Sequence, residues 1–255
     1  MSKILIANWK ANPATFAEAS ELCKKTIAVA LQTSISVVVC PPFVFLEELA
    51  PLFNDIGSSV SMGAQDVFWQ SAGPHTGEIT PDMLANIGCR YVLIGHSDRR
   101  YKLGETDEMI NKKIKACLAT HLTPILLVGE TEKNDAVRPD TLIDQLSRDL
   151  EGLSEGDIER VIFAYEPIWS ISTTPGAIID TPEDAAEAIA TIREIIKKLY
   201  PTLENMPKMF YGGSVNLNDV ESFLSVPEIS GAVVGGASLR SEEFGKMIEI
   251  ASRIS

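Results

Sequence analysis

The sequence is poor in histidine and cysteine and contains no long apolar run. Its 3 histidines lack the helical i, i+4 spacing and the paired cysteines of a structural zinc site, so we expect no metal. The 4 cysteines contain no C-x-x-C pair, which predicts reduced, packed thiols in a cytoplasmic protein. Nothing approaches the roughly 18 uninterrupted apolar residues of a membrane span, and the N-terminal apolar run is too short for a signal peptide. We therefore expect no membrane association.

Basic side chains are also scarce. The chain has 22 Lys and Arg against 35 Asp and Glu, which leaves a formal net charge of −13. Because nucleic-acid binding depends on a basic stripe that releases counterions, we expect no nucleic-acid partner. The sequence has neither a G-x-G-x-x-G motif nor a Walker motif, so no dinucleotide or nucleoside triphosphate is indicated.

The chain does contain a regular alternation of short apolar runs and longer amphipathic segments. With 45% apolar and 22% charged residues among 255, it can fill a sizeable core. Runs such as 37–39 and 125–128 are apolar throughout, which is typical of parallel strands covered on both faces. We expect eight strands, at 4–7, 36–40, 60–64, 91–95, 124–128, 161–165, 208–211 and 231–234.

Helix start signals lie between these strands. Thr181-Pro182 precedes an amphipathic segment at 185–200, and Thr80-Pro81 precedes another at 83–87. A third apolar face runs over 138–150. Strict alternation of strands and helices implies parallel strands joined by right-handed crossovers. Eight units of about 30 residues each close naturally into a single (β/α)₈ TIM-barrel domain over 1–255, with an open doubly wound sheet as the alternative.

Three reactive side chains stand at the predicted ends of strands. Lys10 follows the first strand, His96 follows the fourth, and Glu166 follows the sixth. Taken singly, each has a simpler interpretation, as a solvated surface lysine, a structural histidine or a polar loop residue. A barrel, however, gathers the carboxyl ends of its strands around one mouth, where a cation, a neutral imidazole and a general base would converge.

Paired glycines follow the seventh and eighth predicted strands. Gly212-Gly213-Ser214 and Gly235-Gly236 allow backbone N–H groups to point at an anion, and a helix N-terminus behind them would add a favourable dipole. Either pair by itself could be a plain tight turn. Two pairs at the usual phosphate position of a barrel favour a phosphate ligand.

Together these motifs resemble the triosephosphate isomerase family. The resemblance implies a cofactor-free interconversion of dihydroxyacetone phosphate and D-glyceraldehyde 3-phosphate, both small phosphorylated sugars, through an enediolate. It extends over essentially the whole chain and rests on Asn8-Trp9-Lys10, Gly95-His96-Ser97, Tyr165-Glu166-Pro167-Ile168-Trp169, Tyr211-Gly212-Gly213-Ser214 and Gly235-Gly236-Ala237-Ser238-Leu239.

The resemblance also implies a role for each site residue. Glu166 would move the proton between the two carbons, and His96 would polarise the oxygens as a neutral electrophile. Lys10 would offset the developing negative charge, with Asn8 orienting the oxygen. The phosphate would rest on backbone N–H groups of a closing lid at Ser172 and of Ser214, Gly235 and Gly236.

The segment 66–79 looks like the interlocking dimer loop of the family. The resemblance therefore implies a homodimer in which Thr76 approaches the active site of the partner. Phe68 and Trp69 favour burial of this loop against another subunit, because large apolar side chains are rarely left on a monomer surface. A self-packed surface loop is the alternative.

Three features depart from the family pattern. Asp98 stands where a glutamate is usual, which shortens any contact to Lys10 by one methylene. The lid reads Ile171-Ser172-Thr173-Thr174, and its loss of two glycines narrows the accessible dihedral angles. The segment 175–180 is about three residues longer than usual, so we expect the second hinge to move differently.

Two other functions fit parts of the pattern. One is isomerisation of a slightly larger ketose phosphate, which the changed lid would admit. The other is a catalytically idle phosphate-binding scaffold of the same fold. The retained Lys10, His96 and Glu166 argue against the scaffold, because such a protein has no need of all three.

Overall fold

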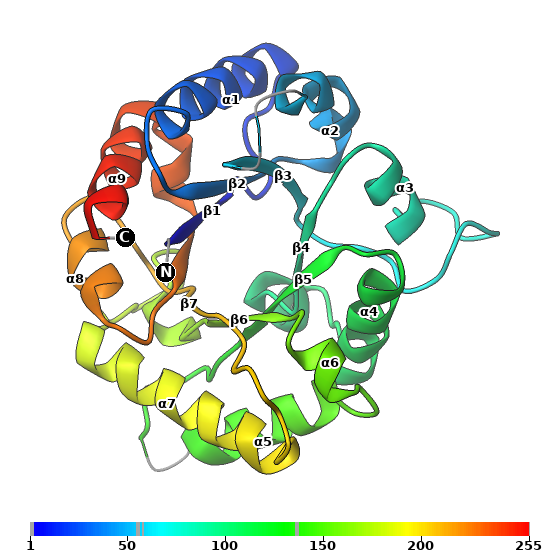
Figure 1. Cartoon of the computed structure of the whole chain (residues 1–255), viewed down its shortest axis with the longest axis vertical. Coiled ribbons are helices and arrows are strands. Elements are labelled where there is room, and N and C mark those ends of the chain that lie inside the picture. Colours follow the sequence, from blue (N-terminus) through cyan, green and yellow to red (C-terminus); the bar gives the residue numbers. More distant parts are fainter. Residues whose placement is uncertain (1–2, 55–56, 58, 136–137, 255) are drawn as a thin grey trace.

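The computed structural model describes residues 3–54, 57, 59–135 and 138–254, so both ends of the predicted domain, 1–255, lie outside the described residues. Eight parallel strands close into a barrel in which β8 pairs again with β1, and helices surround it (Figure 1). The prediction of a (β/α)₈ barrel is confirmed, and the open-sheet alternative is wrong. The strands are β1 (Ile4–Asn8), β2 (Ser36–Cys40), β3 (Val60–Ala64), β4 (Tyr91–Ile94), β5 (Thr123–Val128), β6 (Ile162–Tyr165), β7 (Met209–Tyr211) and β8 (Gly231–Val234).

Each predicted strand is present and differs by at most one residue at either end. β4 ends at Ile94 rather than at Gly95, because Gly95 has a φ of 76°. That left-handed conformation cannot continue a strand and is readily adopted only by glycine. The chain therefore turns sharply at the point where His96 leaves the barrel.

Alternate strand residues pack into two separate apolar clusters. In β1, Ile4 and Ile6 belong to the cluster that also holds Phe210 of β7, whereas Leu5 and Ala7 belong to the larger cluster shared with the helices. Successive side chains of a strand point to opposite faces of the sheet, so the smaller cluster fills the barrel interior. Burial on both faces explains why the sequence of these strands is apolar throughout.

Four of the helices begin directly after a threonine that caps them. Thr80 and Thr181 accept hydrogen bonds from the backbone N–H groups of Met83 and Asp184, as the start signals predict. The helices are α1 (Phe16–Ala30), α2 (Phe43–Leu49), α3 (Pro81–Asn86), α4 (Asp107–Ala119), α5 (Arg138–Asp149), α6 (Glu155–Ile158), α7 (Pro182–Leu199), α8 (Val220–Ser225) and α9 (Ser241–Ile254). Shorter turns are η1 (Ala50–Phe53), η2 (Asp98–Lys102, a π-helical turn), η3 (Ile168–Ser170) and η4 (Gly236–Leu239).

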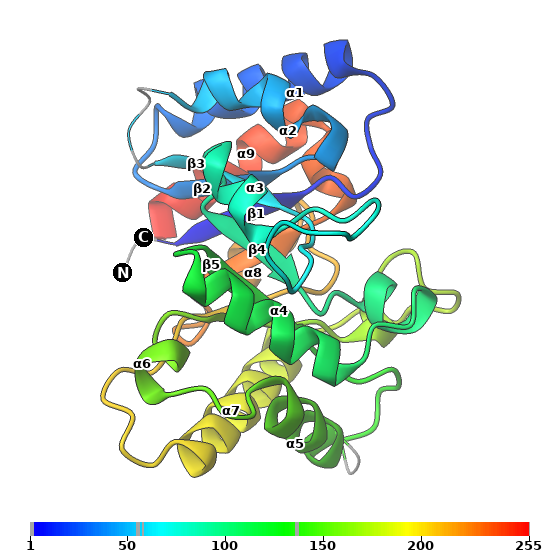
Figure 2. The same ribbon diagram turned by 90° about the vertical axis from the view of Figure 1, so that its right-hand side faces the viewer.

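Two long loops project from the same side of the barrel. In Figure 2 the segment 66–79, drawn in cyan, and the segment 167–180, drawn in yellow-green, both extend away from the side that carries the termini. The rings of Phe68 and Trp69 contact at a tilt of 37° with their centroids 4.3 Å apart, and the His75 ring centroid lies 4.8 Å from that of Phe68. Both aromatic residues are half-buried within the chain itself, and Thr76 is exposed.

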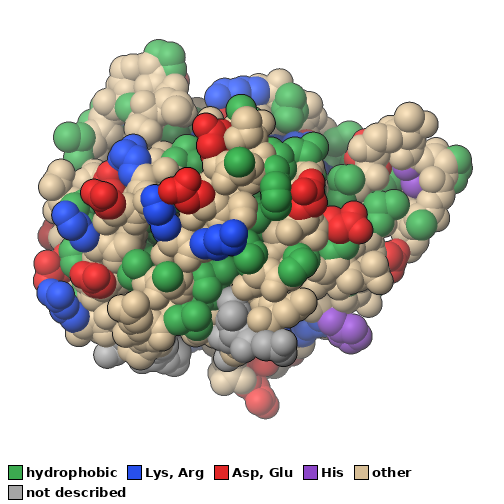
Figure 3. All heavy atoms as spheres, turned by 90° about the horizontal axis from the view of Figure 1, so that it is seen from above, with side chains coloured by type: hydrophobic (Ala, Val, Ile, Leu, Met, Phe, Trp, Pro, Cys, Tyr) green, Lys and Arg blue, Asp and Glu red, His purple; other side chains and the backbone are tan. Residues whose placement is uncertain are grey.

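The distribution of charged side chains on one face and the burial of the cysteines are consistent with the amino-acid composition. Seen from above, on the face formed by α1, α2 and α9, basic and acidic side chains are interspersed (Figure 3). Cys23, Cys40, Cys89 and Cys117 are buried free thiols, as predicted, and burial raises the pKa of Cys23 and of Cys89 to about 12. Among the described residues, no helix combines the length and the apolar character that a membrane crossing requires.

Candidate active site

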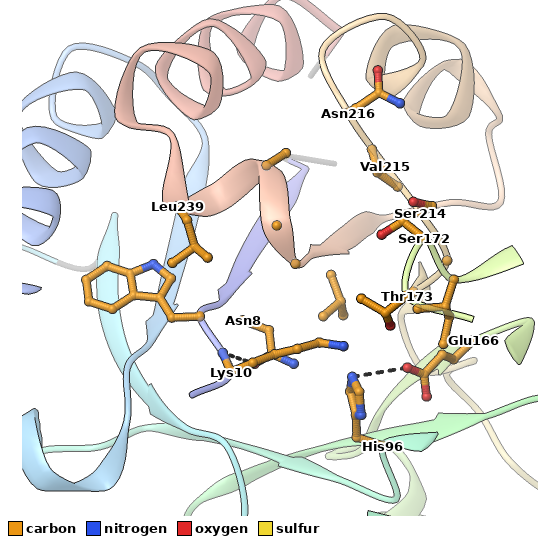
Figure 4. Close-up of a pocket in the computed structure, with 18 of the residues that line it drawn as sticks. Asn8, Lys10, His96, Glu166, Ser172, Thr173, Ser214, Val215, Asn216 and Leu239 are labelled. Carbon is orange, nitrogen blue, oxygen red and sulfur yellow. Dashed lines mark hydrogen bonds and ion pairs between the residues drawn. The ribbon is translucent and has the colours of Figure 1, made fainter. Parts of the chain in front are cut away.

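A cavity of about 460 Å³ opens at the carboxyl ends of the strands, and its wall contains every site residue that the sequence predicts (Figure 4). Lys10, His96 and Glu166 come from the ends of β1, β4 and β6 and point toward one another across the cavity. The predicted residues in the wall are Asn8, Lys10, His96, Glu166, Ser172, Ser214, Gly235 and Gly236.

Lys10 is held in a backbone conformation that few non-glycine residues adopt. Its φ is 51°, in the left-handed region. The Asn8 side chain accepts a hydrogen bond from the Lys10 N–H at 3.1 Å, and the Gln65 amide donates to the Lys10 carbonyl at 2.7 Å. These two contacts compensate the local strain and aim the lysine side chain into the cavity.

Asp98 forms an ion pair with Lys10 despite being one methylene shorter than glutamate. Its Oδ2 lies 3.1 Å from the Lys10 ammonium, and its Oδ1 lies 2.6 Å from that of Lys102. Burial raises the pKa of Asp98, but the hydrogen bond from Lys102 and the charge of Lys10 outweigh burial and lower that pKa to about 2. Asp98 therefore remains ionised and keeps a fixed counter-charge beside Lys10.

His96 is oriented from both ring nitrogens. Its Nδ1 accepts a hydrogen bond from the backbone N–H of Asp98 at 3.0 Å, and its Nε2 lies 3.2 Å from Glu166 Oε1. Because Nδ1 is an acceptor, the hydrogen-bond network assigns the proton of a neutral imidazole to Nε2, which faces the cavity. The expected helix start behind His96 is the short π-helical turn η2, and its first N–H group makes this contact.

Glu166 is 2% exposed, forms a close pair with His96 and accepts two hydrogen bonds from Ser97. The Ser97 backbone N–H donates to Oε2 at 2.8 Å, and the Ser97 hydroxyl donates to Oε1 at 3.1 Å. The backbone of Glu166 lies so close to β5 that a Cβ added to Gly129 would stand 2.0 Å from the Glu166 carbonyl oxygen. The carboxylate is therefore fixed by the segment after β4, and the Glu166 backbone is fixed by the segment after β5.

The glycine pairs form the part of the cavity wall that lies between Glu166 and Lys10. A Cβ on Gly213 would stand 2.2 Å from the Tyr211 hydroxyl oxygen, so no larger residue fits there. Behind β8, η4 begins directly at Gly236, whereas behind β7 the helix α8 begins only at Val220. A helix N-terminus was expected behind both glycine pairs. Only the pair after β8 has one directly behind it, and that element is the short 3₁₀ turn η4.

Side-chain hydrogen bonds anchor the lid in addition to backbone bonds such as that from the Ile178 N–H to the Trp169 carbonyl at 3.0 Å. The Thr174 hydroxyl donates to the Ile168 carbonyl at 2.8 Å. At the far end, the Tyr211 hydroxyl donates to Asp180 at 2.9 Å, and the Ser170 hydroxyl lies 3.4 Å from the same Tyr211 oxygen. Burial raises the pKa of Asp180 to about 6, although the hydrogen bonds from Tyr211 and the Thr181 N–H oppose that rise. One tyrosine therefore links both ends of the lid.

Sequence reasoning missed several residues that support the site. The sequence assigns no role to Ser97 or Gln65, because their bonds join segments far apart in the chain. Glu130 was missed although it accepts hydrogen bonds from the Tyr165 hydroxyl at 2.7 Å and the Trp169 indole at 3.0 Å. Its position two residues after the end of β5 was the available signal. Further unpredicted wall residues include Asn12, Thr173, Asn216, Leu239 and Arg240.

No cation site accompanies this cavity in the part of the chain that the structure describes. No group of three or more His, Cys, Asp or Glu side chains there is arranged to hold a metal ion. The chemistry available from these residues is proton transfer by Glu166, hydrogen bonding by His96 and charge stabilisation by Lys10.

Comparisons with known proteins agree on one family. Residues 3–251 match the family model described as triosephosphate isomerase. The chain is 42% identical over 248 residues to the triosephosphate isomerase of Caldanaerobacter subterraneus subsp. tengcongensis, covering 96% of this chain and 98% of that protein. It is 41% identical over 251 residues to the enzyme of the same name from Dictyoglomus thermophilum, covering 97% and 98%. For Rhodopirellula baltica the identity is 41% over 255 residues, covering 98% of each chain. The chain therefore belongs to the triosephosphate isomerase family.

Proposed function

We propose that this protein interconverts dihydroxyacetone phosphate and D-glyceraldehyde 3-phosphate, with Glu166 as the general base. The observation that carries the proposal is the 3.2 Å contact between the Glu166 carboxylate and the Nε2 of His96, inside a cavity whose other wall is built from paired glycines. Such a base and such a donor are the two groups that an aldose–ketose isomerisation needs within reach of two adjacent carbons.

Glu166 takes the proton from the carbon next to the carbonyl and returns it to the neighbouring carbon. His96 donates its Nε2 proton in a hydrogen bond to the oxygens of the enediolate while that charge develops. The Lys10 ammonium lowers the energy of the same charge, with Asn8 orienting the oxygen. Because these groups are already fixed by Ser97, by the Asp98 N–H and by Gln65, little reorganisation is needed at the moment of reaction.

The phosphate group rests on the glycine wall. Backbone N–H groups of Ser214, Gly235 and Gly236 donate to its oxygens, and the lid adds the N–H of Ser172 when it closes. Closure also excludes water, which protects the enediolate from loss of phosphate. At a net charge of −13 the chain attracts no anion as a whole, so capture depends on this local arrangement.

A coupled assay with D-glyceraldehyde 3-phosphate tests the function. We expect turnover well above that of buffer, because the base, the donor and the cation are all in the cavity wall. A five-carbon ketose phosphate serves as the comparison substrate and is expected to react far more slowly. Turnover equal to that of buffer in folded protein would contradict the proposal, and faster turnover of the larger sugar would favour the alternative isomerase.

We also propose that the protein acts in the cytoplasm as a homodimer, each chain forming one barrel domain over 1–255. The four buried free thiols suit a reducing compartment. The segment 66–79 projects beside the mouth of the barrel and carries Phe68 and Trp69 only half-buried. A second copy would bury this segment, and Thr76 of one chain would then approach the active site of the other chain.

Sedimentation equilibrium tests the dimer. At micromolar concentration the mass should be about twice the 27.7 kDa of one chain. Trp69→Ser should shift the equilibrium toward the monomer. The matched change Trp9→Ser removes a fully buried side chain outside the loop, so it should lower stability rather than disturb segment 66–79. A monomeric mass for the unmodified chain at that concentration would refute the assigned role of segment 66–79.

A further inference from the structure

The inner face of α5 carries polar side chains where an apolar stripe is usual. Arg138, Gln145 and Asp149 are spaced seven and four residues apart, so they share one face of the helix, and all three are buried. Each reaches the end of a strand. Arg138 donates to Glu130 at 3.2 Å, while Gln145 and Asp149 contact the segments that follow β5 and β4.

Asp149 holds Arg100, and Arg100 holds two strand ends. The Asp149 carboxylate accepts a hydrogen bond from Arg100 Nη2 at 2.5 Å. Arg100 Nε donates to the Gly95 carbonyl at 2.7 Å, and its Nη2 also donates to the Leu127 carbonyl at 3.2 Å. Gly95 immediately precedes His96, so the guanidinium fixes the turn from which the imidazole projects.

The turn at Gly95 leaves no room for an alternative arrangement. A Cβ at that position would stand 2.8 Å from Arg100 Nη2 and 3.0 Å from the Leu127 carbonyl oxygen, and the φ of 76° is strained for any other residue. Burial lowers the pKa of the Arg100 guanidinium, but the carboxylates of Asp149 and Asp107 outweigh it and raise that pKa above its ordinary value. Arg100 is therefore always charged in this position.

Gln145 forms a second contact of the same kind, one helical turn before Asp149. Its side-chain amide accepts from the Gly129 N–H at 3.0 Å and donates to the Gly129 carbonyl at 2.9 Å. Gly129 is the residue packed against the Glu166 backbone. The two side chains of α5 thus support the strand ends behind His96 and beside Glu166 respectively.

Burying the Asp149 carboxylate costs desolvation free energy, so stability alone does not explain its presence. It is 0% exposed, and its Oδ1 has no hydrogen-bond partner among the described residues. Burial raises its pKa from the ordinary 3.8 to about 7, with Arg100 opposing the rise, so the folded chain loses stability as pH increases through that interval. Buried ion pairs are often no more stabilising than apolar residues of similar volume, which indicates another reason for the pair.

We propose that Asp149 is a positioning residue for the proton-transfer site, acting through Arg100 and the Gly95 carbonyl on the orientation of His96. The proposal rests on the proposed function. Arg100 and Asp149 touch neither substrate nor the reacting groups. They determine instead whether the Nε2 of His96 stands where the enediolate oxygens form.

The test is a double-mutant cycle of Asp149→Asn and Arg100→Lys, assayed at a pH above 7, where Asp149 is ionised. Asparagine keeps the shape of Asp149 without its charge, and lysine keeps the charge of Arg100 but cannot reach both carbonyls. We expect each single change to lower kcat by about 10-fold or more, because small displacements of reacting groups are costly, with KM changing less than about twofold. The double variant should be no worse than the more impaired single variant. Additive losses in kcat would overturn the proposal.

Leu146→Ala is the matched control for stability. Leu146 is fully buried on the same helix and contacts no strand end through polar atoms, so this change destabilises the protein and should leave kcat unchanged. All variants are assayed below their own unfolding transitions. A loss of kcat in Leu146→Ala equal to that in Asp149→Asn would mean that Asp149 acts only on stability, and would overturn the proposal.

A second readout needs no turnover. The chain has 3 histidines, so the imidazole ¹⁵N resonances of His96 can be assigned. In the free protein, Asp149→Asn should shift both His96 resonances by disturbing the bond from the Asp98 N–H to Nδ1, whereas Leu146→Ala should not. Unchanged His96 resonances in Asp149→Asn would overturn the positioning role. If the unmodified chain lacked isomerase activity, the proposed function would fail, while this measurement would still decide the positioning role.

Discussion

Shortening Glu166 to aspartate is expected to lower kcat by about 10²-fold while leaving the affinity for substrate nearly unchanged. The change withdraws the carboxylate by one methylene from the carbon that it must deprotonate. Glu166 is 2% exposed, and the Ser97 N–H and hydroxyl hold its carboxylate. Its backbone is packed against Gly129, so the backbone cannot move to restore the distance. Binding is retained because the proposed phosphate contacts are backbone N–H groups of the glycine-lined wall, which the change leaves in place.

The measurement is kcat and KM in the coupled assay, with the dissociation constant of inorganic phosphate as an independent check on the phosphate wall. Glu204→Asp is the matched control, since Glu204 is an exposed residue in the loop between α7 and β7, away from the mouth of the barrel. It should behave as the unmodified chain. If Glu166→Asp kept full turnover, the general base would have to be another residue.

The strands could be predicted almost residue for residue, because burial on both faces leaves an apolar run that few other structures need. Two helix starts were equally legible in Thr80-Pro81 and Thr181-Pro182, where the cap chemistry is local. The caps at Thr15 and Thr106 lack the following proline and escaped notice. Local rules thus predict the elements, and the alternation of elements predicts the barrel.

The site was predictable where reactive side chains or glycine pairs follow a strand. Lys10, His96 and Glu166 stand at such positions, and the barrel brings them to one cavity. Most of their supports were not predictable, because the bonds join distant parts of the chain, as from Asp149 to Arg100. A polar residue in an amphipathic helix pattern indicates an exposed face, and only the packing of α5 reveals that Gln145 and Asp149 point inward.

These supports share a physical principle. An imidazole and a carboxylate 3.2 Å apart would turn toward water in an open loop, and holding them requires groups that are themselves fixed. Here the fixing groups are backbone atoms, namely the N–H of Ser97, the N–H of Asp98 and the carbonyl of Gly95. Because backbone atoms move only with their strand, the precision of the site derives from the rigidity of the barrel.

Replacing His96 with asparagine should lower kcat by about 10²- to 10³-fold, the cost of removing one hydrogen-bond donor to a developing oxyanion. The Asn side-chain oxygen falls near the position of Nδ1, so it can still accept the hydrogen bond from the Asp98 N–H that shapes the turn. Nothing in asparagine reaches as far as Nε2, which lies 3.2 Å from Glu166 and faces the cavity. The variant therefore removes the hydrogen-bond donor while keeping the contact that shapes the turn.

His121→Asn is the matched control for this change. His121 is exposed at the start of the segment leading to β5, and its φ of 62° is a conformation that asparagine tolerates better than most residues. Both variants should unfold at nearly the same temperature as the unmodified chain, and only His96→Asn should lose turnover. Since the loss belongs to the transition state, KM for D-glyceraldehyde 3-phosphate should change little. Equal turnover in the two variants would mean that the enediolate is stabilised by Lys10 alone and that the imidazole beside Glu166 serves only to hold the carboxylate.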